Sequence, residues 1–331
     1  MELFELTKKL IEIESISGNE QKVVDFVKDY LQKLHFHVEL QEVVDARCNL
    51  YATQDDPDLI LTTHFDTVAP YIPFSEDEEY IYGRGACDAK GIMAAQIKTV
   101  ERLLDEGWKN IGLLFVIGEE VGSPGARAAG RMHSTSKYFI NGEPTENKLA
   151  IGSKGALRVI LETSGVSAHS AYPDLGDSAI LKLLEVLNDL NAVEMPRDEI
   201  LGETTLNIGT IQGGTQANVV PDFTKTEIML RTVTSADEIK QLLEQTINGR
   251  ADIHYAFHSD PLFLEKVDGF ESTVVSFATD IPLLTNFGKP LLMGPGSIHD
   301  AHSEHERISK KQLTDAVDIY CELAKKLVEQ Q

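Results

Sequence analysis

Apolar residues recur every three to four positions in several segments of the chain, a spacing that places them on one face of an α-helix. Leu3, Leu6 and Leu10 have this spacing, and so do the apolar residues of 23–34. The second segment follows Ser17-Gly-Asn-Glu20, and a serine with a glutamate three residues later is typical of a helix N-terminus. The chain is therefore predicted to begin with two amphipathic helices.

Short apolar runs alternate with helical patterns through the first half of the chain. Residues 58–64, 110–118 and 137–141 form runs with few polar residues, which suits strands that are buried on both faces. A helical pattern spans Met93 to Leu104, and Ser123-Pro124 has the residue preferences of a helix start. This alternation predicts an α/β domain with a mostly parallel central sheet.

After Gly155 the pattern changes to an alternation of apolar and polar residues. The alternation is seen at 157–162 and 227–231, and it indicates antiparallel strands with one covered face. Helical spacing at 180–190 and 239–243 supplies two helices that can cover this face. These segments predict a compact α+β domain.

Apolar segments of the first kind resume near Leu262 and include Pro290-Leu-Leu-Met293. The α+β segment therefore interrupts the α/β domain. We predict that residues 1–154 and 263–331 form the α/β domain and that residues 155–262 form the inserted one.

The composition narrows the classes of partner. The 331 residues are 42% hydrophobic and 25% charged, with a formal net charge of −23, and this balance is typical of a globular protein. The negative charge disfavours nucleic acids and anionic membrane surfaces as partners. Three scattered cysteines suit a reducing compartment, and the N-terminus lacks the pattern of a secretory signal. We therefore expect a cytoplasmic protein that acts on small molecules.

Acidic residues and histidines collect at the ends of the predicted buried strands. In open α/β sheets, ligands bind in the crevice at the carboxyl ends of the strands. So many acids in one crevice would repel one another unless cations held them together, and imidazoles with carboxylates form a zinc-type ligand set. The residues are His64, Asp66, Asp88, Glu119, Glu120 and Glu143, with His299, His302 and His305 in a later loop.

Each of these residues also has a purely structural interpretation. Successive side chains of an extended segment point to opposite sides, so Glu119 and Glu120 could face a substrate and a metal, or they could begin a solvated loop. Asp88 could be an ordinary helix N-cap, and His64 could be a hydrogen-bonded loop residue. The turn Gly83-Arg-Gly85 does not suit a phosphate, because an acid at the following helix start would oppose an anion.

Five short motifs contain these residues. They are Thr63-His64-Phe-Asp66-Thr-Val, Tyr82-Gly-Arg-Gly-Ala-Cys-Asp88-Ala-Lys-Gly, Gly118-Glu119-Glu120-Val-Gly-Ser, Gly142-Glu143-Pro-Thr, and Gly294-Pro-Gly296 with the later Ala301-His302 and Glu306. In this order they resemble the dinuclear-zinc family of amidohydrolases and peptidases that includes acetylornithine deacetylase, succinyl-diaminopimelate desuccinylase, aminoacylase and glutamate carboxypeptidase. The resemblance covers essentially the whole chain.

The resemblance implies a catalytic domain of the zinc-peptidase type that binds two Zn²⁺ ions, for which Co²⁺ or Mn²⁺ could substitute. Asp88 would bridge the two ions. His64 and Glu143 would complete one site, and Glu120 and His302 would complete the other.

The resemblance also implies roles beside the metals. Glu119 would be the general base that takes a proton from a metal-activated water and returns it to the departing amine. Asp66 would hold the imidazole of His64 in its ligating tautomer. The reaction would be the hydrolysis of an amide bond.

Two features leave alternatives open. His299 and His305 have spacings that would also permit metal binding, although Glu306, four residues after His302, fits the family pattern. The stretch from Asp66 to Asp88 is shorter than the family pattern and lacks its tryptophan. We therefore expect a more open rim around the substrate pocket.

The inserted domain resembles the family's lid and dimerisation domain, which implies a homodimer. His169, in Gly165-Val-Ser-Ala-His169, would reach the active site of the partner subunit and stabilise an oxyanion there. Asn218 and Arg231 match positions that contact the substrate carboxylate, for which a guanidinium is well suited. Gly294 and Gly296 are expected to line the substrate site.

Within the family, Glu143 and the Ala301-His302 context look most like acetylornithine deacetylase. We therefore expect a zinc-dependent amidohydrolase of amino-acid biosynthesis that removes an acyl group from an N-acyl amino acid. A metallo-carboxypeptidase or dipeptidase acting on short peptides, or an enzyme like succinyl-diaminopimelate desuccinylase, is the nearest alternative. A binding protein without catalysis is disfavoured, because it would have no use for the base Glu119.

Overall fold

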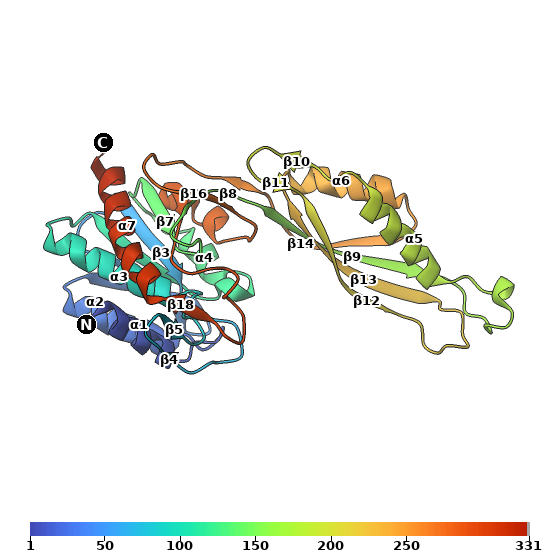
Figure 1. Ribbon diagram of the computed structural model, residues 1–331, viewed down its shortest axis with the longest axis horizontal. Coiled ribbons are helices and arrows are strands. Elements are labelled where there is room, and N and C mark those ends of the chain that lie inside the picture. Colours follow the sequence, from blue (N-terminus) through green and yellow to red (C-terminus); the bar gives the residue numbers. More distant parts are fainter. Residues whose placement is uncertain (330–331) are drawn as a thin grey trace. The chain divides into compact units, whose positions relative to one another are not determined.

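The chain folds into two compact units in the computed structural model, which describes residues 1–329 (Figure 1). The first unit consists of Met1–Ile151, Leu264–Thr273 and the chain from Thr279 onward. The second consists of Gly152–Phe263 and Val274–Ala278. The second unit is therefore inserted into the first.

Residues 274–278 belong to the second unit, whereas the sequence-based division places them in the first domain. The backbone N–H of Lys154 donates to the carbonyl of Val275 at 3.0 Å, and Ser153 Oγ donates to the carbonyl of Phe277 at 2.5 Å. These long-range bonds attach the segment to the start of the second unit, and no local pattern in the sequence encodes them.

A mixed six-stranded sheet forms the centre of the first unit, in the order β1-β2-β6-β3-β7-β17. Strand β3 is parallel to β6 and β7, β17 is parallel to β7, and β2 is antiparallel to both β1 and β6. Every residue of β3 and β6 is buried, as expected for strands with both faces covered. The predicted α/β class is confirmed. The strands are β1 (His37–Val44), β2 (Arg47–Thr53), β3 (Leu59–His64), β6 (Ile111–Val116), β7 (Tyr138–Asn141) and β17 (Lys289–Leu292).

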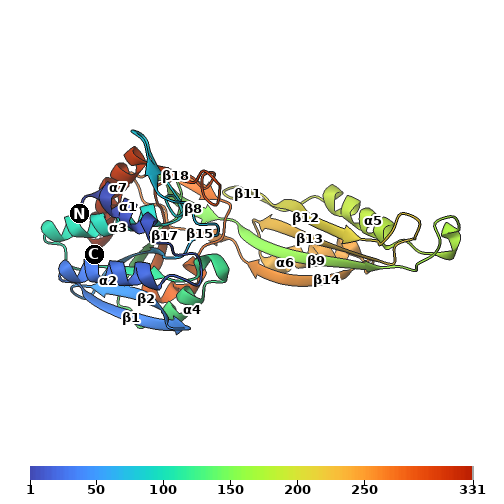
Figure 2. The same ribbon diagram turned by 90° about the horizontal axis from the view of Figure 1, so that it is seen from below.

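Helices cover this sheet. Helices α1, α3 and α7 pack against one another, and α3 and α7 also contact β3 (Figure 1). Helix α2 packs on β1 and β2 (Figure 2). The first two helices appear where the apolar spacing predicts them, with Leu6, Leu10, Val23 and Val27 buried. The helices are α1 (Leu3–Glu12), α2 (Gln21–Lys33), α3 (Lys90–Asp105), α4 (Pro124–Ala129) and α7 (Lys310–Glu329).

The predicted N-terminal cap of α2 was wrong. Helix α2 begins at Gln21, and its N-cap residue Glu20 makes no side-chain capping bond. Ser17 Oγ instead donates to Asp66 Oδ2 at 2.8 Å. The Ser17 side chain therefore hydrogen-bonds to a loop that is distant in sequence, and a local capping pattern cannot predict that contact.

Short elements complete the first unit. Strands β18, β5 and β4 form a small antiparallel sheet that pairs Arg307 with Tyr82 and Ile308 with Ile81. It joins the C-terminal part of the chain to the segment that precedes Gly83. The elements are β4 (Ser75–Glu76), β5 (Tyr80–Tyr82), β18 (Arg307–Ser309) and the 3₁₀ turns η1 (Glu119–Val121), η3 (Ile281–Leu283) and η4 (Thr285–Phe287), while β8 (Leu149–Ser153) and β16 (Ser272–Val275) each run from one unit into the other.

The second unit is an antiparallel sheet with two helices on one face (Figure 1). The strand order is β12-β13-β9-β14. The alternating apolar residues of β9 and β13, among them Leu157, Val159, Ile228 and Leu230, are buried against both helices, as the alternation predicts. The elements are β9 (Gly155–Ser164), β12 (Thr205–Gly213), β13 (Phe223–Thr232), β14 (Asp252–Ser259), α5 (Ala179–Ala192) and α6 (Ala236–Ile247), with the short β10 (Arg197–Asp198), β11 (Gly202–Glu203), β15 (Leu262–Phe263) and η2 (Pro173–Leu175).

Among the described residues, no helix combines the length and the apolar character that a membrane span requires.

The doubly covered strand β3 should be sensitive to side-chain truncation. Leu61 is fully buried, so Leu61→Ala should lower the free energy of unfolding by about 2–5 kcal/mol. Leu40 on the edge strand β1 is 39% exposed, and Leu40→Ala should change it by no more than about 0.5 kcal/mol. Urea unfolding followed by circular dichroism would measure both, and equal losses would contradict the assignment of β3 to the core.

Candidate metal centre

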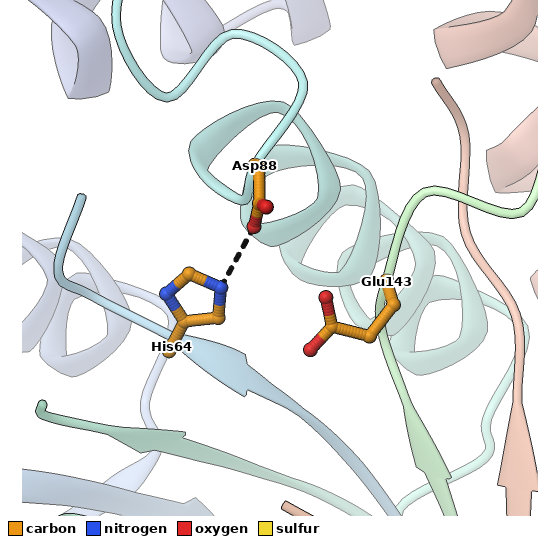
Figure 3. A group of neighbouring side chains, drawn as sticks. All are labelled: His64, Asp88 and Glu143. Atoms are coloured by element: carbon orange, nitrogen blue, oxygen red, sulfur yellow. Dashed lines mark hydrogen bonds and ion pairs between the residues drawn. The ribbon is translucent and has the colours of Figure 1, made fainter. Parts of the chain in front are cut away.

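Three segments of the first unit bring a histidine and two acids together (Figure 3). His64 is the last residue of β3, Asp88 lies just before α3, and Glu143 follows β7. Their side chains point into one space, and one donor atom of each lies within 4.8 Å of the others. His64 Nε2 is 2.9 Å from Asp88 Oδ1. This group meets at the carboxyl ends of parallel strands, where ligands bind in sheets of this kind.

A second group shares one member with the first. Asp88, Glu120 and His302 also place one donor atom each within 4.8 Å of one another. His302 Nε2 is 2.8 Å from Glu120 Oε1 and 3.3 Å from Asp88 Oδ2. Asp88 therefore turns one oxygen to each group, which is the arrangement a bridging ligand needs. It is not the N-cap of α3, because that position is Ala89.

The main chain orients the imidazole of His64. Its Nδ1 is 2.9 Å from the carbonyl oxygen of Asp66 and 3.6 Å from Asp66 Oδ1. An N–H at Nδ1 can donate to the carbonyl. Nε2, which faces Asp88, would then be the nitrogen that gives up its proton when a metal binds. The sequence predicts that Asp66 holds this tautomer, and the structure gives the shorter contact to its backbone oxygen.

The Asp66 carboxylate holds the turn that carries the two glutamates. Its Oδ1 accepts the backbone N–H of Glu119 at 3.0 Å, and its Oδ2 accepts that of Glu120 at 3.2 Å. The sequence predicts an extended pair here, but the left-handed Gly118 ends the strand segment and the glutamates form a 3₁₀ turn. Successive residues of such a turn are about 120° apart, so the two side chains still diverge.

The electrostatics of the cluster favour a bound cation. Burial and the charge of Glu143 raise the pKa of Glu119 well above its ordinary value, and burial and the charge of Asp88 do the same for Glu143. Burial also acts to raise the pKa of Asp88, but His302 and His64 outweigh it and lower that pKa. The hydrogen bonds that the His302 imidazole donates to the carboxylates of Asp88 and Glu120 raise the pKa of His302 to about 10. The carboxylates of the two donor groups thus strongly favour the binding of positive charge between them.

The donor set fits divalent transition metals. Imidazole nitrogens and carboxylate oxygens suit Zn²⁺, Co²⁺ and Mn²⁺. The nearest thiol, Cys87, belongs to neither donor group and donates to the carbonyl of Ser297 at 3.2 Å. Among the described residues, His299 and His305 are exposed and also lie outside both groups. His302 is therefore the histidine of this loop that the structure brings to Asp88.

Asp280 is a buried acid of this region that the sequence reasoning missed. It is 2% exposed, and neither carboxylate oxygen has a hydrogen-bond partner of standard geometry among the described residues, although Ser123 is near enough to lower its pKa. Burial raises its pKa to about 6, and its charge contributes to the raised pKa values of Glu119 and Glu143. It lies in Thr279-Asp280-Ile-Pro, which looks like an ordinary turn in the sequence.

Gly294 packs against the backbone of Glu143 and Gly296 against Cys87, and both use their N–H groups within the protein. Gly294 N–H donates to Thr145 Oγ1 at 3.0 Å and Gly296 N–H to Gln312 Oε1 at 3.1 Å. A Cβ on Gly294 would lie 2.6 Å from the carbonyl oxygen of Glu143. These glycines therefore allow close packing, and a contact of theirs with substrate stays a prediction.

Within the second unit, His169 and Asn218 are brought together, and both are exposed. The backbone N–H of Ser170 donates to the carbonyl of Asn218 at 3.0 Å. His169 Nδ1 accepts the backbone N–H of Ala171 at 3.1 Å, which assigns the ring proton to Nε2. Arg231 on β13 is half-buried, which lowers its pKa, and no hydrogen bond or ion pair of its guanidinium is seen in residues 1–329.

Comparison with known proteins gives close relatives over nearly the whole chain. A peptidase M20 domain-containing protein of Schizosaccharomyces pombe is 39% identical, with 96% of this chain and 83% of that protein covered. A protein of Aspergillus clavatus described as a "probable carboxypeptidase" is 36% identical, with 98% and 88% covered.

A solved structure and a family model agree with these relatives. The crystal structure of a tripeptidase from Staphylococcus aureus has the same fold, with a TM-score of 0.82, 21% sequence identity, and 99% and 98% of the two chains covered. The model of peptidase family M20/M25/M40 matches residues 60–326. The chain therefore belongs to the peptidase family M20/M25/M40.

Proposed function

We propose that this M20-family hydrolase cleaves the amide bond of a substrate that carries a free α-carboxylate next to that bond. Short peptides are the first candidates, which would make it a carboxypeptidase or dipeptidase. The observation that carries the proposal is the pair of donor groups that share Asp88, with Glu119 on the turn beside them.

The proposed metal ligands are the five residues of the two donor groups. His64, Asp88 and Glu143 would hold one ion, and Asp88, Glu120 and His302 the other. Two divalent cations held there would supply Lewis acidity and a lowered pKa for water. Zn²⁺ is the proposed metal, because His and carboxylate donors suit it.

Glu119 is the proposed general base. The backbone N–H bonds to Asp66 fix the position of the turn, and Glu120 occupies the second donor group while Glu119 belongs to neither. Burial, the first cause of its raised pKa, makes the Glu119 carboxylate a stronger base. A carboxylate of this kind can take a proton from water and return it to the departing nitrogen.

The second unit would recognise the substrate carboxylate and the oxyanion. Arg231 is half-buried without a partner among the described residues, and a guanidinium binds a carboxylate in two parallel hydrogen bonds. Asn218 would add an amide donor. The tautomer of His169 presents an Nε2–H that could donate to an oxyanion, in the active site of the partner subunit if the protein is a homodimer.

N-acyl amino acids are the second candidate substrates. They present the same bond and the same carboxylate as the last residue of a peptide. The likeness of Glu143 and Ala301-His302 to acetylornithine deacetylase favours them, whereas the names of the relatives favour peptides. The two substrate classes differ only on the acyl side of the bond, so they can be compared directly.

Substitutions of the neighbouring residues Glu119 and Glu120 should have different effects on metal content and on turnover. Glu119→Gln should keep the metal content of the wild type and lower kcat by about 10²–10⁴-fold, because a general base is lost. Glu120→Gln should lose metal, because a ligand is lost. Elemental analysis and steady-state rates on the same preparations would test both, and near-normal turnover of Glu119→Gln would remove it as the base.

Substrate recognition can be tested with one panel. Dipeptides, tripeptides, N-acetyl and N-succinyl amino acids should be hydrolysed only with a free carboxyl terminus, and Arg231→Met should lower kcat/KM for them about ten- to hundredfold. Equal cleavage of carboxamide-terminated substrates would contradict the proposal. The ratio of rates for dipeptides and N-acetyl amino acids would decide between peptidase and deacylase.

If His169 acts in the active site of the partner subunit, two inactive variants should complement each other in a mixed dimer. His169→Ala should lower kcat about 10²–10³-fold without loss of metal. Mixed dimers of His169→Ala and Glu119→Gln should regain part of the activity, because one of their two sites receives an intact base and an intact histidine. Absence of any regain in verified mixed dimers would exclude action in trans.

A further inference from the structure

Glu306 is a buried acid that belongs to neither donor group. It is 1% exposed and lies four residues after His302, directly before β18. The strand pairing of β18 with β5 places it beside the loop that leads from Gly83 to Asp88. Burying an unpaired charge is costly, and hydrogen bonds to a buried carboxylate offset that cost.

The loop supplies all of these hydrogen bonds. Glu306 Oε1 accepts the backbone N–H groups of Gly85, Cys87 and Asp88, each at 3.0 Å. Glu306 Oε2 accepts Arg84 Nη1 at 2.6 Å. Donors face both oxygens, and Glu306 lies outside both donor groups.

The main chains of the two segments are joined as well. The N–H of Gly83 donates to the carbonyl of Glu306 at 3.0 Å. Gly85 has a φ of +86°, and a Cβ there would lie 2.9 Å from the Lys90 side chain. Glycine is needed for this close approach. The loop therefore wraps its N–H groups around one carboxylate, in the manner of backbone anion sites.

We propose that Glu306 is a positioning residue that fixes the bridging carboxylate Asp88 for metal binding. The inference rests on the proposed metal centre. The carboxylate of Glu306 is the only acceptor recorded for the Asp88 N–H among the described residues. Because Glu306 lies in the same segment as His302, the same bonds set the spacing between two ligands of the second group. Such supporting residues typically change metal affinity by about 10–100-fold.

Two substitutions of Glu306 probe different parts of this contact. Glu306→Gln keeps the shape and an oxygen for the three N–H groups, but it turns an NH₂ toward the Arg84 guanidinium. Glu306→Asp keeps the charge but is one methylene shorter, so it cannot reach the loop and Arg84 as before. Both should weaken Zn²⁺ binding by about tenfold or more. Adding Arg84→Met to Glu306→Gln should restore part of the affinity, because it removes the opposed donor.

A control separates positioning from general stability. Leu103 is fully buried near the far end of α3, roughly 20 Å along the helix from Asp88 at about 1.5 Å per residue. Leu103→Ala should destabilise the fold without changing Zn²⁺ affinity. The metal-free proteins are first shown to be folded by circular dichroism at the assay temperature. Zn²⁺ dissociation constants are then measured by competition with a chromophoric chelator.

The outcomes are distinguishable. Weaker Zn²⁺ binding in both Glu306 variants, with Leu103→Ala at the wild-type value, supports the inference. Wild-type affinity in folded Glu306→Gln and Glu306→Asp overturns it and leaves the proposed function intact. Failure of the wild type itself to bind Zn²⁺ would overturn the metal centre and this inference with it.

Discussion

The placement of Asp88 between two histidines is the constraint on which the rest of the site depends. One of its oxygens faces His64 and the other faces His302. These partners come from β3 and from a loop near the end of the chain, so the site exists only when the sheet and the C-terminal segment are both in place. Burial raises the pKa values of Glu119 and Glu143, and repulsion from the neighbouring acids raises them further. Bound cations would reverse the sign of that interaction.

The same kind of hydrogen bonding, from backbone N–H groups to a buried carboxylate, supports the cluster at two places. Asp66 and Glu306 are buried carboxylates outside both donor groups, and each accepts backbone N–H groups from a turn that carries functional residues. Asp66 holds the turn of Glu119 and Glu120, and Glu306 holds the loop of Asp88. A carboxylate that accepts hydrogen bonds from the main chain fixes the backbone position from which a functional side chain extends. It does not compete with that side chain for the metal. This explains why two further acids are tolerated in an already acidic crevice.

The two units divide the work in the proposed reaction. The first unit contains the donor groups and the proposed base, on elements anchored in a doubly covered sheet. The second unit contains His169, Asn218 and Arg231, whose side-chain donors, unpaired within residues 1–329, would bind an oxyanion and a carboxylate in that reaction. Family membership agrees with hydrolysis of amide bonds, and the choice of acyl group depends on side chains that recognise substrate rather than on the metal ligands.

Local patterns in the sequence determined the elements and the residue types of the site. The spacing of Leu6 and Leu10, and the apolar runs that became β3 and β6, specify helices and buried strands because side-chain periodicity follows directly from backbone geometry. The motifs around His64, Asp88, Glu120, Glu143 and His302 pointed to the residues that the structure brings into two groups. Only the tertiary structure decided the partners that lie far apart in the chain. In the folded protein Ser17 donates to Asp66 instead of capping a helix, and Glu119 and Glu120 form a 3₁₀ turn. Asp280 is buried, and Glu306 accepts a hydrogen bond from a loop 218 residues earlier in the chain. These hydrogen bonds depend on which distant segments become neighbours when the sheet forms, and a local sequence pattern does not encode those neighbours.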